Sequence, residues 1–317
     1  MISYILKRLA LAAAALLVIV SLCFFAIRLM PGSPFDDPDL SPAMQQLMEE
    51  KYHLHESLPR QYYFYLKDIL TEGYWGVSLK LEPQVPVWQV LRSRIPVSLV
   101  MNLLALLLAL PLGILAGTAA ALHRSRFPDH LISLLVVLGI SVPSFVFASC
   151  LQYFCGYKLG AFSLVYNSLG TPGEKLFSLI LPILALSFGP IATVCRYLRG
   201  ELAEQLSSDY LLLARAKGLS RLQSIVRHAF RNAAVPLLSV TMPMFASVLS
   251  GSLVVETVFA VPGVGGILTR SIQNNDYWLT VAALVFYSLV SLITGLLTDL
   301  AYVLVDPRIR LKGGQHG

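Results

Sequence analysis

The stretch SSDYLLLARAKGLSRLQSIVRHAFRNAAVP, residues 207–236, is polar and basic in a sequence that is otherwise mostly apolar. This basic segment (residues 207–236) predicts two short helices joined by a bend. Asp209 is a candidate N-terminal cap of the first helix, and Gly218 stands where a left-handed residue would end it. Ser220 and Gln223 form the Ser-x-x-Gln pattern of a capping box, which predicts the start of the second helix.

The second predicted helix has an apolar face and several cations. Apolar residues recur at the spacing of one helical face, at Leu222, Ile225, Val226, Ala229 and Phe230. Arg227, His228 and Arg231 fall in what we expect to be its last turns, where cations suit the helix dipole. On this pattern alone, two interpretations are equally open: an ordinary amphipathic helix in a loop, and a surface that docks another protein.

The composition is typical of a protein with several membrane-spanning helices. The 317 residues have a mean hydropathy of +0.68 and only 13% are charged, against roughly 25% in soluble domains. The predicted fold class is therefore an all-α polytopic membrane protein. The net charge of +6 is scattered among the apolar runs, which favours a topological role for the cations over nucleic-acid binding.

The cysteines and histidines show no pattern of a reactive or metal site. Cys23, Cys150, Cys155 and Cys195 lie in or beside apolar runs, without Cys-x-x-Cys or Cys/His ligand spacing. We therefore expect buried thiols and neither a disulfide nor a metal. The sequence also offers no Ser/His/Asp arrangement in a supporting context, so we expect no catalytic residues.

Six apolar runs have about the 20 residues that a spanning helix needs. They occupy residues 9–29, 96–122, 131–154, 176–197, 237–256 and 281–305. A cleaved signal peptide is the alternative for the first run, but its apolar core would be shorter, so we expect an uncleaved span. The predicted divisions are a first helix (1–30), an extracytoplasmic insertion (31–95), a five-helix core (96–305) containing a cytoplasmic loop (199–235), and a cytoplasmic tail (306–317).

Serine, proline and glycine residues that start, end or interrupt helices add detail to this organisation. In the insertion, Ser41-Pro42 starts a helix that extends to about Lys51, and Ser57-Leu58-Pro59 starts another that Gly73 ends. In the second span, Gly113 and Gly117 permit close approach of another helix. Pro143 interrupts the third span.

The basic residues predict the orientation. Placing both termini, the turn after the second span and the loop at residues 196–235 inside assigns 14 of the 24 Lys and Arg residues to the cytoplasm. Six of the other 10 lie in the long insertion, and long segments count little in the positive-inside rule. The charge distribution therefore agrees with six spans and cytoplasmic termini.

Several blocks resemble one family of transport proteins. ARAKG (214–218) and RHAFRNAAVP (227–236) resemble the cytoplasmic coupling loop of ABC importer permeases, in its peptide-permease form. RLMPGSPF (28–35), KYHLHESLPRQYYFYLK (51–67) and GVSL (76–79) resemble the outer segment of the oligopeptide B-type permeases. Leu212 and Leu213 stand where the general loop motif has Glu and Ala, so no charge contact is expected at Leu212.

This resemblance implies a fold, partners and a set of functional residues. The fold is that of a type I ABC importer permease. The partners are a second homologous permease, one or two ATPase subunits and an extracytoplasmic oligopeptide-binding protein. The residues that match the coupling loop, and are expected to contact the ATPase, are Asp209, Ala214, Arg215, Ala216, Lys217, Gly218, Arg227, His228, Arg231 and Asn232.

The sequence contains no motif for binding and hydrolysing ATP. No Walker A pattern occurs, so we expect ATP and Mg²⁺ on the partner ATPases and no cofactor here. VPGVGG (261–266) lacks the phosphate-binding Lys. In the resembling family this block belongs to an outer re-entrant or interfacial element, and a plain turn is the alternative.

Polar residues within apolar runs are costly and are candidates for the translocation path or gate. Glu256, at the outer end of the fifth span, either serves the path or reaches water at the interface. Asp299, near the inner end of the sixth span, is expected to pair with a loop arginine. Asn102 is expected to join helices rather than bind a ligand.

Three functional interpretations remain. The first is half of an ABC importer for oligopeptides, with dipeptides, nickel chelates and sugars as alternative substrates of the same branch. The second is an ion-driven secondary transporter, which would place carboxylates at mid-membrane in two related halves. The third is a membrane-embedded enzyme, for which no catalytic set is visible. The resemblance favours the first.

Overall fold

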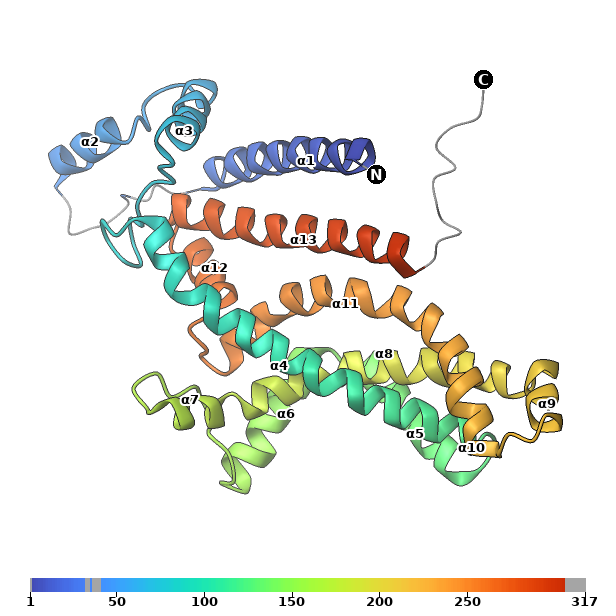
Figure 1. Ribbon diagram of the computed structural model, residues 1–317. Helices are drawn as coiled ribbons and strands as arrows, with labels where there is room; N and C mark the ends of the chain where they lie inside the picture. The colour runs from blue at the N-terminus through green and yellow to red at the C-terminus, as the bar shows by residue number, and fades with distance from the viewer. Residues whose placement is uncertain (1, 32–34, 36–40, 306–317) are drawn as a thin grey trace. The chain divides into compact units, whose positions relative to one another are not determined.

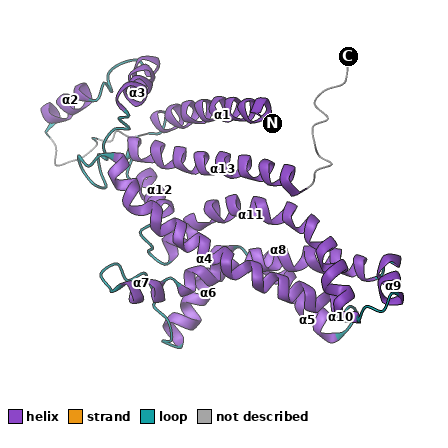
Figure 2. Cartoon of the chain, in the orientation of Figure 1, coloured by secondary structure: helices purple, strands orange, loops and turns teal. Residues whose placement is uncertain are grey.

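The computed structural model describes residues 2–31, 35 and 41–305, and within these ranges the chain is helical without a β-strand (Figures 1 and 2). An isolated antiparallel bridge joins Val77 to Pro86. The predicted tail, 306–317, lies outside the described residues, as do parts of the block RLMPGSPF. The described chain thus has the all-α fold class predicted for it.

The chain divides into two compact units, each described here by itself. The first unit comprises residues 1–98 and 261–292, and the second comprises 99–260 and 293–317. Two long helices, α4 (Val87–Leu122) and α13 (Tyr277–Val305), contribute to both units.

The first unit contains α1 (Ile2–Arg28), α2 (Pro42–Lys51), α3 (Leu58–Glu72) and α12 (Val264–Gln273), with the first parts of α4 and α13. Its core forms where α1 meets α3 and the start of α13. The rings of Phe24 and Tyr65 stack there, with their centroids 5.2 Å apart. The buried residues Val20, Ile27 and Val281 complete this apolar contact.

The two helices predicted in the insertion are confirmed at both ends. The Ser41 side chain accepts a hydrogen bond from the Met44 amide, 3.3 Å away, at the start of α2. Gly73 ends α3 in the left-handed conformation, with φ +63°. Both ends follow from local chemistry, because a cap or a left-handed residue acts within one turn of the chain.

The second unit is organised around α8 (Ile180–Leu206). The helices α5 (Phe127–Ser141), α6 (Ser144–Leu151) and α11 (Arg231–Val258) pack against it (Figure 1). A wide π-helical turn, η1 (Gln152–Lys158), extends α6, and the short helix α7 (Pro172–Ser178) precedes α8. The elements α9 (Asp209–Ala216), α10 (Arg221–Ser224) and the π-helical η2 (Ile225–Phe230) connect α8 to α11.

Two glycines allow α4 to approach α8 closely, as predicted. A Cβ atom at Gly113 would lie 2.7 Å from the Cβ of Val194. A Cβ atom at Gly117 would lie 2.8 Å from the carbonyl oxygen of Cys195. Neither position has room for a side chain without separating the helices.

We expect Gly117→Ala to destabilise the protein by about 1–3 kcal/mol, because overpacking a close contact against backbone forces the two helices apart. Gly200→Ala is the matched control, because a Cβ atom at Gly200 would meet nothing within 4 Å. Thermal unfolding of the purified chain in detergent measures both. Equal unfolding temperatures for Gly117→Ala and Gly200→Ala would show that α4 and α8 can move apart without loss of stability.

Apolar helices account for four or five spans within the described residues. The helical stretches Leu6–Arg28, Val87–Leu122, Ile180–Leu206 and Tyr277–Asp299 are each long and apolar enough to cross a membrane. The pair Phe127–Ser141 and Ser144–Lys158 makes a fifth if it is one span, and it bends by 107°. The bend falls at Pro143, so the predicted interruption is confirmed. The helix of the predicted fifth span, α11, is not among these candidates, and six spans remain a prediction.

Several predicted boundaries are wrong. The second span was expected from residue 96, but α4 begins at Val87. The last was expected from 281, but α13 begins at Tyr277. The fourth was expected over 176–197, but Leu179 separates α7 from α8, which extends to Leu206. Hydropathy marks the apolar part of a helix, whereas backbone hydrogen bonding continues into polar turns at its ends.

All four cysteines are free thiols, as expected, but their predicted burial is only partly correct. Cys195 is buried, Cys23 and Cys155 are half-buried, and Cys150 is exposed on the chain. Apolar sequence context does not distinguish a residue inside a helix bundle from one on its surface, because the surface of a membrane-spanning bundle is apolar too.

Candidate functional site

The first helix of the basic segment is α9, and its predicted cap is wrong. Ser208 precedes the helix with extended backbone, and Asp209 is its first residue. The Ser208 hydroxyl donates to the carbonyl of Gln205, 2.6 Å away, and makes no capping bond. Asp209 still places a negative charge at the positive end of the helix dipole, where it is favourable.

Gly218 occupies the left-handed conformation predicted for it, with φ +91°. Its amide donates to the carbonyl of Arg215 at 2.9 Å, and the amide of Leu219 donates to Ala214 at 3.3 Å. These bonds satisfy the last carbonyls of α9 and turn the chain away from its axis. A Cβ atom at Gly218 would meet nothing within 4 Å, so the backbone angle alone makes glycine favourable here.

The predicted capping box at the start of α10 is confirmed. The Ser220 hydroxyl accepts from the amide of Gln223 at 3.2 Å. The Gln223 side chain accepts in return from the amide of Ser220 at 3.1 Å. The bend between α9 and α10 is therefore defined by hydrogen bonds on both sides of Gly218.

The second predicted helix does not end near residue 236. The helix that starts at Arg221 continues through η2 into α11 and ends at Val258. Arg227, His228 and Arg231 consequently lie inside a long helix, and their predicted interaction with a helix C-terminus is wrong. No residue between Arg231 and Pro236 forces an end, and α11 contains Pro236 itself.

The wide turn η2 also divides the predicted apolar face. Ile225 and Ala229 are buried, whereas Leu222 and Val226 are 70% and 57% exposed. On α9, Leu211 and Ala214 are buried, whereas Leu212 and Leu213 are 63% and 58% exposed. The single stripe expected from a 3.6-residue period assumes regular α-helix, and the π-helical turn breaks that period.

The basic segment thus presents both apolar and charged groups on its surface. Its exposed apolar side chains are Leu212, Leu213, Leu222 and Val226. Of the ten predicted coupling residues, Ala214 is buried and the remaining nine are exposed: Asp209, Arg215, Ala216, Lys217, Gly218, Arg227, His228, Arg231 and Asn232. Exposed apolar residues beside cations are typical of a surface that another protein covers.

An ion pair with a buried carboxylate joins α5 to α8, the helix that leads into the basic segment. Asp129, at the start of α5, has 1% of its surface exposed. The Arg199 guanidinium on α8 reaches it with Nε 2.5 Å from Oδ1 and Nη2 2.8 Å from Oδ2. The Ser125 amide donates to Oδ2 at 2.9 Å. This bidentate pair holds α5 against α8.

Glu256 lies in the last turn of α11 and is completely buried. The Ser252 hydroxyl donates to its carboxylate at 3.0 Å. The interpretation that Glu256 reaches water is therefore wrong. Asn102 on α4 is 1% exposed, and Asp299 on α13 is partly exposed.

The second half of the VPGVGG block, residues 264–266, begins a helix, so the block is more than a plain turn. Gly263 precedes α12 with extended backbone. The amide of Val264 donates to the Ser98 hydroxyl at 2.9 Å, and both residues are buried.

Comparison with known proteins identifies the family. A family model described as "Binding-protein-dependent transport system inner membrane component" matches residues 88–311. The chain belongs to this family. It is therefore a membrane permease subunit of a transport system, as the sequence predicted, and it lies in the inner membrane.

Relatives of this permease align over nearly its whole length. The dipeptide transport system permease protein DppB of Lactococcus lactis is 40% identical over 311 residues, which cover 98% of this chain and 100% of the relative. DppB of Bacillus subtilis is 39% identical over 309 residues, 97% and 98% of the two chains. The oligopeptide transport system permease protein OppB of Escherichia coli is 35% identical over 314 residues, 98% and 100% of the two chains.

The permease also has a buried polar site that sequence reasoning missed. Asp276 precedes α13 and has no exposed surface. Its carboxylate accepts from the Ser78 hydroxyl at 2.5 Å and from three amides, those of Leu79, Lys80 and Leu81, at 3.1–3.2 Å. An Asp before an apolar run is a recognisable cap, but nothing local predicts that a loop about 200 residues earlier encloses it.

We expect Asp276→Asn to destabilise the first unit of the permease by about 1.5–3 kcal/mol, because hydrogen bonds to a charged acceptor contribute roughly that much. An asparagine retains one acceptor oxygen for four donors. Limited proteolysis of the loop at residues 76–86 measures the effect, with the exposed Asp209→Asn as control. Cleavage at the wild-type rate in Asp276→Asn would mean that the carboxylate does not hold this loop.

Proposed function

We propose that this permease forms half of the translocation pathway of an ATP-driven peptide importer. Its homologous partner permease would form the other half, and one or two ATPase subunits and an extracytoplasmic binding protein would complete the complex. The near full-length similarity to relatives named as dipeptide and oligopeptide permeases supports the substrate class. Those names include both peptide lengths, so the sequence-based preference for oligopeptides remains a prediction.

The observation that carries the coupling role is the surface of the basic segment. A left-handed Gly218 separates α9 from a helix that continues without a break from Arg221 to Val258. We assign the exposed leucines, valine and cations to contact with an ATPase, which would bind ATP and Mg²⁺ itself. Movement of that ATPase would displace α10, and the continuous helix would transmit the displacement along α11.

The proposed topology has six spans, with both termini and the basic segment in the cytoplasm. The distribution of Lys and Arg supports this orientation. Cysteine labelling from each side of the membrane tests it. A position among Arg215, Lys217 and Arg227 that is labelled from outside, in intact cells, contradicts it.

The candidates for the translocation path are Glu256, Asn102 and Asp299. Burial of Glu256 and Asn102 within this chain favours a role in packing helices over contact with a substrate. Asp299 is partly exposed, so it is accessible to other groups. We therefore expect its replacement by Asn to alter transport more than folding.

Peptide uptake by vesicles that contain the whole complex tests the function. We expect uptake of a labelled dipeptide or a longer peptide to stop when ATP is removed and to continue when ionophores collapse ion gradients. Uptake that follows the ion gradient instead would support an ion-driven transporter. Comparing peptides of two and five residues decides the preferred length.

We expect Arg227→Glu to reduce co-purification of the ATPase subunits at least ten-fold. The side chain is exposed beside Val226. The basic segment presents cations to the proposed partner, so a carboxylate at this position would oppose the charge complementarity of the interface. Arg92→Glu, a charge reversal outside the basic segment, is the control. An unchanged yield of ATPase with Arg227→Glu removes this side chain from the proposed contact.

A further inference from the structure

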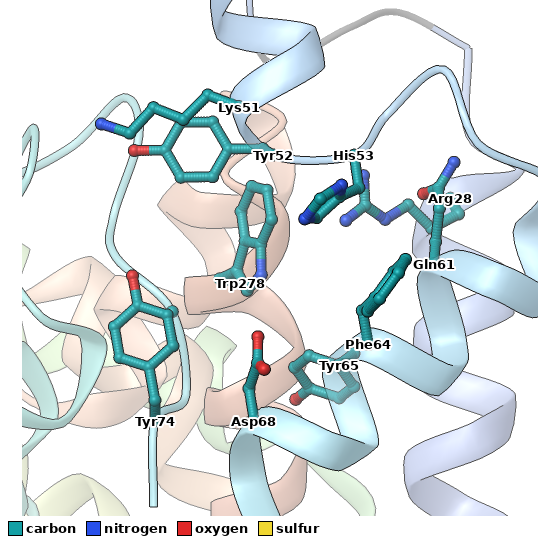
Figure 3. A pocket seen from close by; sticks show the side chains of 11 residues that line it. Arg28, Lys51, Tyr52, His53, Gln61, Phe64, Tyr65, Asp68, Tyr74 and Trp278 are labelled. Atoms are coloured by element: carbon teal, nitrogen blue, oxygen red, sulfur yellow. The ribbon is translucent and has the colours of Figure 1, made fainter. Parts of the chain in front are cut away.

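The first unit contains a cavity of about 220 Å³ with an aromatic and charged lining (Figure 3). We refer to it as the aromatic cavity. The end of α1, the C-terminal part of α2, α3 and the start of α13 supply its walls. The residues that carry the argument are Arg28, Lys51, Gln61, Tyr65, Asp68 and Trp278.

Two buried oxygens in the lining lack hydrogen-bond donors within the described chain. The Gln61 amide nitrogen donates to the carbonyls of Leu54 at 3.0 Å and Glu56 at 2.8 Å. These bonds determine the orientation of the amide, and its Oε1 has no partner among the described residues. The Tyr65 hydroxyl is likewise buried without a partner there. Burial raises the pKa of Tyr65, so the hydroxyl keeps its proton.

The cations of the cavity are held by aromatic rings rather than by carboxylates. The Arg28 guanidinium lies 4.8 Å from the ring centroid of Trp278 and 5.0 Å from that of Tyr277. The Lys51 ammonium lies 5.3 Å from the ring of Tyr52. Neither cation forms an ion pair within the described part of the chain, and neither does the carboxylate of Asp68.

Charges of both signs that have no ion-pair partner among the described residues therefore line one small space. A cation over aromatic faces retains its attraction for an anion, and a half-buried carboxylate beside tyrosine attracts an ammonium group. The volume is below the roughly 300–1,000 Å³ of drug-sized sites, so it suits a single small polar group. Water alone would satisfy the two oxygens, whereas a zwitterion would also pair with the half-buried charges of Arg28 and Asp68.

We propose that the aromatic cavity binds a small zwitterion, with its anionic group at Arg28 and its ammonium group at Asp68 and Tyr65. Two sources have this chemistry: the phosphoethanolamine headgroup of a phospholipid, and a soluble amino acid or short peptide. Arg28 ends the apolar stretch Leu6–Arg28, and Trp278 lies at the start of another, Tyr277–Asp299. Both residues therefore lie where headgroups meet apolar helices.

Fluorescence of Trp278 provides a test on the full-length chain in detergent. The sequence has three tryptophans, so Trp75→Phe with Trp88→Phe leaves Trp278 as the reporter. The probes are dihexanoyl phosphatidylethanolamine, dihexanoyl phosphatidylglycerol and dialanine. We expect saturable quenching by phosphatidylethanolamine, by dialanine or by both, and at least ten-fold weaker binding of phosphatidylglycerol, which has the anion without the ammonium.

Two variants test the assignment of the charges. We expect Asp68→Asn to weaken zwitterion binding at least ten-fold and to leave phosphatidylglycerol binding unchanged. Arg28→Gln should weaken the binding of all three probes, and Asp68→Asn still tests the proposal if Arg28→Gln does not fold. Glu72→Gln, an exposed change in α3 outside the cavity, is the control and should bind as the parent does.

Each outcome decides the proposal. Binding of the lipid alone identifies a headgroup site, binding of dialanine alone identifies a site for a soluble ligand, and binding of both supports the shared chemistry. Absence of saturable quenching by all probes refutes a zwitterion site. Equal affinity for phosphatidylglycerol, or an unchanged affinity in Asp68→Asn, also refutes it.

Discussion

Replacing Gly218 by valine is expected to reduce ATP-driven peptide uptake at least ten-fold while the permease still inserts into the membrane. The residue has φ +91°, which a β-branched side chain adopts only with strain. Left-handed backbone costs an L-residue roughly 1–2 kcal/mol, so the bend between α9 and α10 should change its angle. Because a Cβ atom at Gly218 meets nothing, the helices themselves should remain folded.

Two further variants separate the bend from general damage. Gly218→Asn should retain most of the uptake, because asparagine tolerates the left-handed region better than other side chains. Gly200→Val changes a glycine of α8 that also has open space around it, and uptake should remain close to that of the wild type. Uptake, ATP hydrolysis and the amount of inserted protein are measured together. Normal uptake with Gly218→Val would show that the angle of the bend is not needed to transmit movement of the ATPase to the permease.

Breaking the Asp129–Arg199 pair is expected to have the largest effect on stability. Removing one partner of a buried ion pair typically costs about 3–5 kcal/mol. The Arg199 side chain is 36% exposed, so water can compensate part of the lost charge and we expect about 2–3 kcal/mol for Asp129→Asn. The variant should also loosen α5 from α8, which connects directly to the basic segment.

Thermal unfolding in detergent measures the loss of stability in Asp129→Asn, and ATP-driven uptake measures its effect on transport. Arg196→Gln, an exposed change on α8 three residues away, is the control and should unfold at the wild-type temperature. The double variant Asp129→Asn with Arg199→Gln should be less destabilised than the sum of the two single changes, because neither then leaves a buried charge unpaired. Additive losses would indicate that the pair contributes no interaction energy.

Local chemistry explains which parts of the structure the sequence predicted correctly. The Ser220–Gln223 capping box, the left-handed Gly218 and the limits of α2 and α3 each depend on residues within one or two turns. Close approach at Gly113 and Gly117 was also predictable, since the lack of a side chain is itself the cause. Local rules failed at α9, where Asp209, the predicted cap, is the first helical residue and Ser208 precedes it without a capping bond.

The sequence by itself determined the family, the helical class and the bend in the basic segment, because composition, periodicity and caps act over short distances. Only the tertiary structure decided that the helix after the bend continues to Val258, that Glu256 is buried, and that Asp129 pairs with Arg199. It also brought Asp276 to a loop near residue 78 and surrounded Arg28 with rings. These features join residues far apart in the chain, and their stability comes from burial and charge pairing, which exist only once the helices have packed.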